Sequence, residues 1–418
     1  MVKKIIFIFE RKYGYATDKK YFGFNYYLSK GFELEAWSLA DWTFNHSGDD
    51  KPQNIDLSGF TIYIDNYESF MLNINRVRND SCIFLIYPYH AYNYISYIIR
   101  KSIKNINKDF INILEYDVYY KYVSKSKIAL FIYYFFKKIG SLIKVIFSIS
   151  HGVKNFKTNL INFSVRALGP QIYKSYVNII PSKVSLYYMP CFKEAMNKNN
   201  VFTHAETYDD WLQASDINKY GKYIVYVDQG LLVNDDRIRN YHKSLVSDKN
   251  EFYNSLMTLF NKIRDDYGCD VIVAVHPKAM YKGNEFGRFK MIRGETNTLI
   301  KHSVLVIFEM STCFGQIILS KKPFLNIYRK EYFNYDKSLK KLYACINSVL
   351  NCKQLDVSNS DSINNYNEYI YNYSAESYDK FKYEFIVDRL NDNNISTFEI
   401  ISSIINKYKK IDKELSFL

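Results

Sequence analysis

The sequence predicts an α/β protein with two domains, each built around a doubly wound parallel sheet. The chain has 418 residues, more than a single hydrophobic core normally serves. Its residues are 48% hydrophobic, which is enough for two sizeable cores and excludes a globally disordered chain. Short apolar runs of strand length alternate with segments of helical periodicity in both halves. This alternation is typical of parallel sheets with helices on their faces.

The first half contains five apolar runs that predict parallel strands, at 3–9, 32–39, 61–65, 82–87 and 110–114. The segments between them predict helices, the first of which is capped by Asp18 and ended by Gly31. No Gly-x-Gly-x-x-Gly motif follows the first strand, which argues against a classical dinucleotide-binding domain. We assign residues 1–205 to an N-terminal domain, although 153–219 shows no regular pattern.

Residues 125–150 form the most apolar stretch of the chain, and they include Lys137, Lys138 and Lys144. The longest uncharged run, 128–136, is far shorter than the roughly 20 residues that a membrane span needs. The apolar residues share one helical stripe and the lysines lie toward another side, so the segment predicts a basic amphipathic helix on an anionic membrane surface. A buried helix or helical pair at the edge of the N-terminal domain is the alternative.

The second half repeats the same alternation, and we assign residues 206–395 to a C-terminal domain and 396–418 to a terminal helical segment. Apolar runs predict strands at 222–227, 271–275, 289–292, 304–308 and 323–327. Helical periodicity and caps predict helices at 248–267, 297–302, 314–320, 336–350, 375–390 and 397–410. The polar stretch 353–373 predicts a surface loop.

Polar residues follow three strands of the second predicted sheet at the point where each strand ends. They are His276, Pro277 and Lys278 after the first, Gly294, Glu295 and Thr296 after the second, and Ser311 and Thr312 after the third. In open parallel sheets, ligands bind at the carboxyl ends of the strands. The sequence therefore predicts a binding site at this edge.

Hydroxyl and carboxylate groups at this edge suit the parts of a nucleotide. Ser311 and Thr312 are good caps for the helix at 314–320. Hydroxyls beside the uncapped backbone N–H groups at the start of a helix can bind a phosphate. Glu295 and Thr296 open the preceding helix, where a carboxylate complements the helix dipole or takes a ribose hydroxyl. The structural alternative is that these residues only cap their helices.

His276 is the residue at this edge most suited to chemistry. Pro277 holds its backbone extended, so its ring points off the end of the strand. A histidine there can bind a phosphate oxygen or protonate a leaving group near neutral pH, and Lys278 adds a cation. The set predicts a site for a nucleotide-activated sugar, and the alternative reading of His276 and Pro277 is a simple turn.

The order of these motifs over about residues 220–330 resembles the donor half of bacterial sialyltransferases of the GT-B fold. That group includes lipooligosaccharide sialyltransferases and capsule polysialyltransferases, and related capsule glycosyltransferases with other donors share parts of the pattern. The resemblance implies two Rossmann-like, doubly wound domains facing across a cleft, with 396–418 crossing back to the N-terminal domain. It also implies that His276, Ser311 and Thr312 bind the phosphate of CMP-sialic acid, and that His276 assists the departure of CMP.

The same families carry an acidic-acidic-Gly motif that supplies the general base. The nearest match here is Asp228, Gln229 and Gly230, in which the second acid is replaced by Gln229. This motif directly follows the first strand of the C-terminal domain, so Asp228 is either the base or a residue of the donor-side loop. Glu10 and Asp65, which end strand-like runs in the N-terminal domain, are the other candidates for the base.

The resemblance implies an inverting glycosyltransferase that moves sialic acid, or a related nonulosonic acid, from a CMP-activated donor to a bacterial surface glycan. The glycan would be a lipooligosaccharide or a capsule polysaccharide. No Asp-x-Asp occurs in a strand-to-loop position, so we expect metal independence and no cofactor besides the CMP-sugar donor. The alternatives are a GT-B transferase that uses a UDP-, GDP- or CMP-Kdo donor, a nucleotide-sugar epimerase, or a binding protein without activity.

The charge of the chain favours anionic partners. The formal net charge is +13, which suits nucleotides, acidic glycans or membrane headgroups. No long block of consecutive Lys or Arg and no RNA-binding signature appears, so a nucleic-acid partner is not expected. The apolar run at 5–9 is too short for a signal peptide and is followed by charges. We therefore expect a cytoplasmic protein, peripheral on the inner membrane through 125–150.

Overall fold

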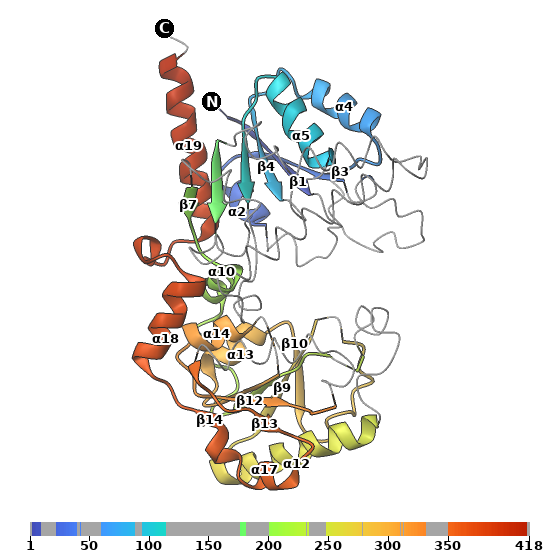
Figure 1. The fold of residues 1–418 in the computed structure, drawn as a ribbon, viewed down its shortest axis with the longest axis vertical. Coiled ribbons are helices and arrows are strands. Elements are labelled where there is room, and N and C mark those ends of the chain that lie inside the picture. Colours follow the sequence, from blue (N-terminus) through green and yellow to red (C-terminus); the bar gives the residue numbers. More distant parts are fainter. Residues whose placement is uncertain are drawn as a thin grey trace, which may run out of the picture. The chain divides into compact units, whose positions relative to one another are not determined.

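The chain folds into two compact α/β units in the computed structural model (Figure 1). Unit 1 comprises Met1–Tyr116, Lys125–Glu206 and Asp388–Leu418, and unit 2 comprises Asp117–Ser124 and Thr207–Val387. The structure describes residues 2–9, 22–39, 42, 60–87, 94–113, 176–180, 200–230, 232–233, 248–277, 279–309, 311, 313–331 and 350–415, with only the backbone described over 409–415. The predicted amphipathic segment 125–150 lies outside these ranges.

Unit 1 is built on a seven-stranded parallel sheet with the strand order β3-β2-β1-β4-β5-β6-β7. Its strands are β1 (Lys4–Phe9), β2 (Glu33–Ser38), β3 (Thr61–Tyr63), β4 (Cys82–Tyr87), β5 (Phe110–Ile113), β6 (Val177–Ile180) and β7 (Asn200–Phe202). The order reverses between β1 and β4, which makes the sheet doubly wound as predicted. Strands β6 and β7 fall in the stretch that the sequence left unassigned.

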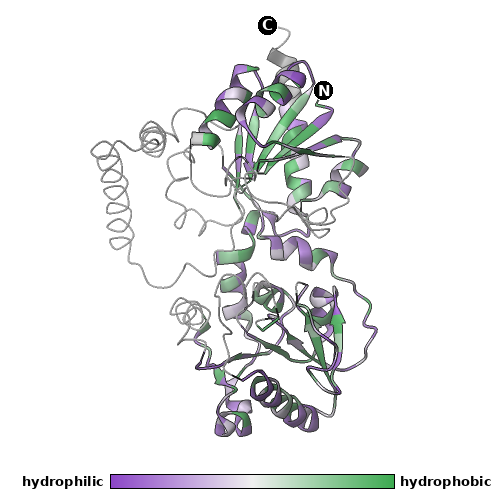
Figure 2. Cartoon of the chain, turned by 90° about the vertical axis from the view of Figure 1, so that its right-hand side faces the viewer, coloured by the Kyte–Doolittle hydropathy of each residue, from purple (hydrophilic) through white to green (hydrophobic). Residues whose placement is uncertain are grey.

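Helices cover both faces of this sheet, because each strand alternates apolar side chains toward two separate cores. They are α2 (Phe24–Ser29), α4 (Tyr67–Arg76), α5 (Tyr94–Asn105), the 3₁₀ turn η4 (Arg389–Asn391) and α19 (Thr397–Leu415). One core lies beneath α4 and α5, and the other lies beneath α2 and α19. In Figure 2 the strands of unit 1 are mostly green, whereas its helices carry both green and purple.

The terminal helix α19 belongs to unit 1 although unit 2 separates it from the rest of that unit in sequence. Phe398, Ile401 and Ile405 are buried in the same core as Phe7 and Tyr27. Figure 1 shows α19, in red, running beside the blue and green elements of unit 1. The last helical segment therefore packs on the N-terminal sheet, the position expected for the final helix of a GT-B fold.

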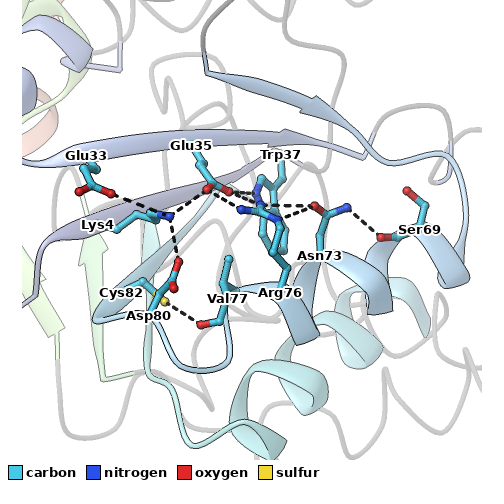
Figure 3. Close-up of polar contacts among 10 residues, drawn as sticks. All are labelled: Lys4, Glu33, Glu35, Trp37, Ser69, Asn73, Arg76, Val77, Asp80 and Cys82. Carbon is cyan, nitrogen blue, oxygen red and sulfur yellow. Dashed lines mark hydrogen bonds and ion pairs between the residues drawn. The ribbon is translucent and has the colours of Figure 1, made fainter.

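A network of charged side chains lies at the amino edge of the unit 1 sheet (Figure 3). The carboxylate of Glu35 accepts hydrogen bonds from Arg76 at 2.6 and 3.0 Å, from Lys4 at 3.1 Å and from the Trp37 indole at 2.9 Å. Lys4 also donates to Asp80 at 2.8 Å. Burial alone acts to raise the pKa of Glu35, but these donors outweigh it and lower that pKa to about 2.

We expect Glu35→Gln to lower the free energy of unfolding of unit 1 by about 2 to 3 kcal/mol at pH 7. Because the folded-state pKa lies below its ordinary value, this stabilisation is present above about pH 4.5 and is lost as the pH falls toward 2. Urea unfolding followed by tryptophan fluorescence in a Trp211→Phe background, which leaves tryptophans only in unit 1, measures it.

Glu33→Gln is the matched control, because Glu33 is 69% exposed and pairs with the same Lys4 at 3.9 Å. An exposed pair of this kind contributes less than about 1 kcal/mol. Equal losses in the two variants, or a difference between wild type and Glu35→Gln that persists unchanged at pH 2.5, would contradict the role given to Glu35.

Unit 2 repeats the doubly wound arrangement, with the strand order β10-β9-β8-β11-β12-β13 and β14 antiparallel to β12. Its strands are β8 (Ile224–Val227), β9 (Val271–Val275), β10 (Lys290–Arg293), β11 (Val306–Phe308), β12 (Phe324–Tyr328), β13 (Leu355–Asp356) and β14 (Ile370–Tyr371). The two units give the chain the pair of Rossmann-like sheets that defines the GT-B fold, as predicted. The prediction of a loop at 353–373 is wrong, because β13 and β14 lie there with short helices between them.

The helices predicted at 248–267, 297–302 and 314–320 are present in unit 2, and the helix predicted at 336–350 lies outside the described residues. The described helices of unit 2 are α10 (Glu206–Gln213), α12 (Lys249–Tyr267), α13 (Thr296–His302), α14 (Phe314–Leu319), α17 (Ser360–Asn364), η2 (Tyr366–Tyr369), α18 (Ala375–Phe381) and the π-helical turn η3 (Lys382–Ile386). Helix α12 begins after Asp248, whose carboxylate accepts from two backbone N–H groups, and ends at Gly268. The helix predicted at 375–390 is wrong beyond Ile386, where Val387 is extended.

Candidate functional site

The order of the unit 2 sheet reverses between β8 and β11, and polar residues follow both strands there. Asp228 comes directly after β8, while Glu309 and Ser311 follow β11. His276 comes directly after β9, the neighbour of β8 on its other side. Since the strands are parallel and in register, these residues share the carboxyl edge of one sheet, at the place where ligands of open α/β sheets bind.

Asp228 connects the end of β8 to the turn that follows β9. Its Oδ1 accepts from the Gly230 backbone N–H at 2.8 Å and from the Tyr281 hydroxyl at 2.9 Å. Its Oδ2 accepts from the His276 backbone N–H at 3.1 Å. The side chain is buried, with 5% exposure. Asp228, Gly230 and His276 are thus brought together, and the carboxylate serves as an acceptor for internal donors.

Burial raises the pKa of Asp228, while the donors around it and the charge of Arg293 act in the opposite direction. Burial also raises the pKa of Tyr281, and the charge of Asp228 adds to that effect. The Tyr281 hydroxyl therefore keeps its proton and stays a donor to Asp228. The Tyr281 ring packs against the core of unit 2, with its centroid 5.4 Å from that of Phe286.

Gly230 allows this close approach. Its φ is +58°, in the left-handed region that favours glycine. A Cβ atom at this position would lie 3.1 Å from Cβ of Ala279 and 3.3 Å from Cβ of His276. The neighbouring Gln229 is also buried. The motif after β8 is therefore packed directly against the turn that carries His276.

Arg293, the last residue of β10, holds the same turn from another direction. Its Nη1 donates to the carbonyls of His276 at 2.9 Å and Pro277 at 2.6 Å, and its Nη2 donates to the carbonyl of Ala279 at 2.6 Å. A planar guanidinium can hold several acceptors in one rigid geometry. The His276 backbone is consequently bound on its N–H side by Asp228 and on its carbonyl side by Arg293.

Ser311 is not the cap of α14 that its residue type predicted, because the helix begins three residues later, at Phe314. Its hydroxyl accepts from the Cys313 N–H at 3.1 Å, and its carbonyl accepts from the Phe314 N–H at 3.1 Å. Cys313 is the cap residue of α14 and makes no side-chain cap bond. Thr312 and Lys278 lie outside the described residues, so their predicted contacts with a phosphate stay predictions.

The second predicted group of site residues comprises Gly294, Glu295 and Thr296, and its carboxylate contacts the segment that precedes β8. Glu295 precedes α13 without a side-chain cap bond, and its carboxylate accepts from the Tyr220 hydroxyl at 3.4 Å and pairs with Lys219 at 3.6 Å. Both partners belong to the segment that enters the amino end of β8. Gly294 has a φ of +83°, which makes the turn into α13, and Thr296 is the first residue of that helix. A contact of these residues with a ribose stays a prediction.

Two buried charged residues at this edge were missed as site residues. Glu309 is 1% exposed, and its Oε1 accepts from the Tyr226 hydroxyl at 3.1 Å. Arg329, directly after β12, is fully buried and pairs with Glu251 at 3.1 Å and Glu331 at 3.5 Å. The signal that could have found them is a charged residue immediately after a buried strand, which is costly unless it is paired.

The structure does not single out either of the candidate bases of unit 1, Asp65 and Glu10. Asp65 is exposed and follows β3, the outermost strand of its sheet. It therefore lies two strands away from the β1–β4 pair, where the order of that sheet reverses. Glu10 lies outside the described residues. The identity of the general base stays a prediction for Glu10, Asp65 and Asp228 alike.

The carboxyl ends of β1 and β4 in unit 1 carry a cluster of aromatic rings. Phe9 ends β1 and Tyr87 ends β4, and their ring centroids are 5.1 Å apart. The Phe22 ring lies 4.5 Å from Phe9 and 4.8 Å from Tyr87, and the three side chains are buried. Residues 10–21 and 88–93, which follow these two strands, lie outside the described residues.

No family model matches the chain, and no curated protein matches it. Solved structures share its overall layout at low similarity. The UDP-GlcNAc 2-epimerase from Methanocaldococcus jannaschii has 10% sequence identity, covering 97% of this chain and 99% of the other, with a TM-score of 0.48. The wall teichoic acid polymerase TagF has 13% identity over 99% and 90%, with a TM-score of 0.47. MurG from Acinetobacter baumannii has 7% identity over 87% and 89%, with a TM-score of 0.40. At these values the similarity carries no functional inference.

None of the helices in the described part of the chain is long and apolar enough to cross a membrane.

Proposed function

We propose that the protein is a glycosyltransferase that binds a nucleotide-activated sugar at the carboxyl edge of the unit 2 sheet. The observation that carries the proposal is the turn after β9, in which His276 is fixed between Asp228 and Arg293 beside the reversal point of the sheet. A histidine in this position can bind a phosphate oxygen and protonate a departing nucleotide.

For the donor we propose a CMP-activated sialic acid or related nonulosonic acid, and for the acceptor a bacterial lipooligosaccharide or capsule glycan. This finer proposal rests on the motif pattern around His276, Glu295 and Ser311. The transfer would proceed with inversion and without a metal ion. In that reaction the bond between the anomeric carbon and the phosphate oxygen of CMP breaks, and that oxygen takes a proton from His276. An acceptor hydroxyl attacks the anomeric carbon after losing its proton to a base.

The experiment that tests this proposal is nucleotide release from a panel of donors, with product analysis. The purified chain is incubated with CMP-sialic acid, CMP-Kdo, UDP-GlcNAc and a GDP-sugar, with and without a lipooligosaccharide acceptor. Release of CMP that the acceptor accelerates, with a new glycan product, is the expected result. Interconversion of a UDP-sugar without nucleotide release would identify an epimerase instead. Binding of a donor without nucleotide release or sugar conversion would identify a binding protein without activity.

A further inference from the structure

We infer that Asp228 and Arg293 are positioning residues that hold the His276 turn from two sides, and that Asp228 is not the general base. The inference rests on the proposed role of His276 in donor cleavage. It assigns a function to Arg293, which no motif singled out, and it replaces the catalytic reading of Asp228 with a structural one.

The first step of the argument concerns the acceptor capacity of Asp228. Oδ1 accepts two hydrogen bonds and Oδ2 accepts one, all from donors of unit 2 itself. The carboxylate is 5% exposed. A general base must reach the proton that it removes within hydrogen-bond distance of the substrate. Three of the roughly four acceptor sites of the carboxylate are already used by donors of unit 2, and the remaining site, on Oδ2, belongs to a buried residue.

The second step concerns the backbone that these bonds hold. The His276 N–H is fixed by Asp228, while the carbonyls of His276, Pro277 and Ala279 are fixed by Arg293. The Met280 N–H adds a bond of 3.3 Å to the carbonyl of Val233. Hydrogen bonds to charged groups are roughly twice as strong as those between neutral groups. The Ala279 N–H donates to the carbonyl of His276 at 3.0 Å, so Asp228 and Arg293 stabilise a turn that this bond closes, and with it the position of the His276 Cβ.

The third step concerns the position of the two side chains in the sheet. Asp228 follows the central strand β8 and Arg293 ends the edge strand β10, so they hold the turn after β9 from its two neighbouring strands. Both strands are anchored in the core of unit 2, β8 through Ile224 and Tyr226 and β10 through Met291, which packs against the same cluster. A site on rigid elements keeps a reacting group within the small tolerance that catalysis requires.

Amide hydrogen exchange in the ligand-free chain tests the inference directly. Asp228→Asn keeps an acceptor at Oδ1 but places an amide donor against the His276 N–H. Arg293→Lys keeps the positive charge but loses the planar guanidinium that donates to three carbonyls at once. We expect the His276 amide in the first variant, and the Ala279 amide in the second, to exchange at least tenfold faster than in the wild type. Arg264→Lys is the control, because Arg264 pairs with Asp265 on the exposed side of α12.

A double-mutant cycle on donor cleavage separates positioning from base catalysis. We expect Asp228→Asn to slow cleavage by at least tenfold in the wild type and by less than twofold in a His276→Ala background, because it acts through His276. Tyr281→Phe, which removes one hydrogen bond to Asp228 and leaves the His276 N–H bound, should slow cleavage by less than Asp228→Asn in the wild type.

The outcomes are distinguishable from a failure of the proposed function. Unchanged exchange of the His276 and Ala279 amides would overturn the inference whether or not a donor is bound. A full loss with Asp228→Asn in both backgrounds, with unchanged exchange, would make Asp228 the base. If no donor is cleaved by the wild type but the exchange rates rise as expected, the proposed function fails while the positioning of His276 by these two residues stands.

Discussion

Replacing His276 with alanine is expected to slow nucleotide release from the donor at least 100-fold. General acid catalysis by a positioned side chain contributes about 10²–10⁴-fold, and the same ring is expected to hold a phosphate oxygen. His276 is only half-buried, and the turn around it is held through its backbone, which alanine retains. The free energy of unfolding should therefore change by less than about 0.5 kcal/mol.

His302→Ala is the matched control for this variant. His302 lies in the same unit, at the end of α13, and its Nε2 makes a hydrogen bond of 2.9 Å to the carbonyl of Ser215. We expect that change to affect stability and to leave nucleotide release within twofold of the wild type. A His276→Ala protein that releases nucleotide within threefold of the wild type would remove His276 from the chemistry.

Gly230→Ala is the second change with a large expected effect. Alanine at a φ of +58° costs about 1 kcal/mol, and its Cβ would lie 3.1 and 3.3 Å from the Cβ atoms of Ala279 and His276. The turn after β9 must shift to accommodate it, because both neighbours are Cβ atoms fixed to the backbone. We expect a loss of about 2 to 3 kcal/mol in the free energy of unfolding and at least a tenfold loss of affinity for the nucleotide.

Gly268→Ala isolates the contribution of the close contact. Gly268 ends α12 with a φ of +62°, and a Cβ there would meet nothing within 4 Å. It therefore carries the left-handed cost alone, about 1 kcal/mol, and no loss of affinity. Urea unfolding and nucleotide titration of the two variants compare them directly. Equal stability losses and equal affinities would show that Gly230 is required only for its backbone conformation.

Most of the strands that the sequence predicted consist largely of apolar residues. Strands β8 and β9 contain only apolar or aromatic residues, and their burial follows from that composition. Strands β6 and β7 were missed because they have only 4 and 3 residues and lie in a stretch without a regular pattern, and each also contains an asparagine, a residue that is typical of turns. In the structure Asn112, Asn178 and Asn200 bond side chain to side chain across β5, β6 and β7, at 3.0 and 3.1 Å. Pairing of this kind satisfies a buried amide, and the periodicity of one strand cannot reveal it.

The candidate site was predicted only in part for a similar reason. The position of His276 after a buried strand follows from the local pattern, and the structure places it at the expected edge of the sheet. The partnership of Asp228 with the His276 N–H joins residues 48 positions apart, and that of Arg293 with the same turn depends on the pairing of β10 with β9. A spacing in sequence cannot distinguish a carboxylate that removes protons from one that binds backbone N–H groups.

The measurement that tests the central claim most directly is nucleotide binding to the wild-type chain, followed as a shift in thermal unfolding with CMP, UDP and GDP. We predict that CMP alone stabilises the protein, by about 2.7 kcal/mol at 100 times its Kd, and that Gly230→Ala weakens this effect. Stabilisation by UDP or GDP in place of CMP would retain a nucleotide site and contradict the proposed donor. If none of the three nucleotides changes the unfolding of the wild type, the carboxyl edge of unit 2 is not a nucleotide site and the account is wrong.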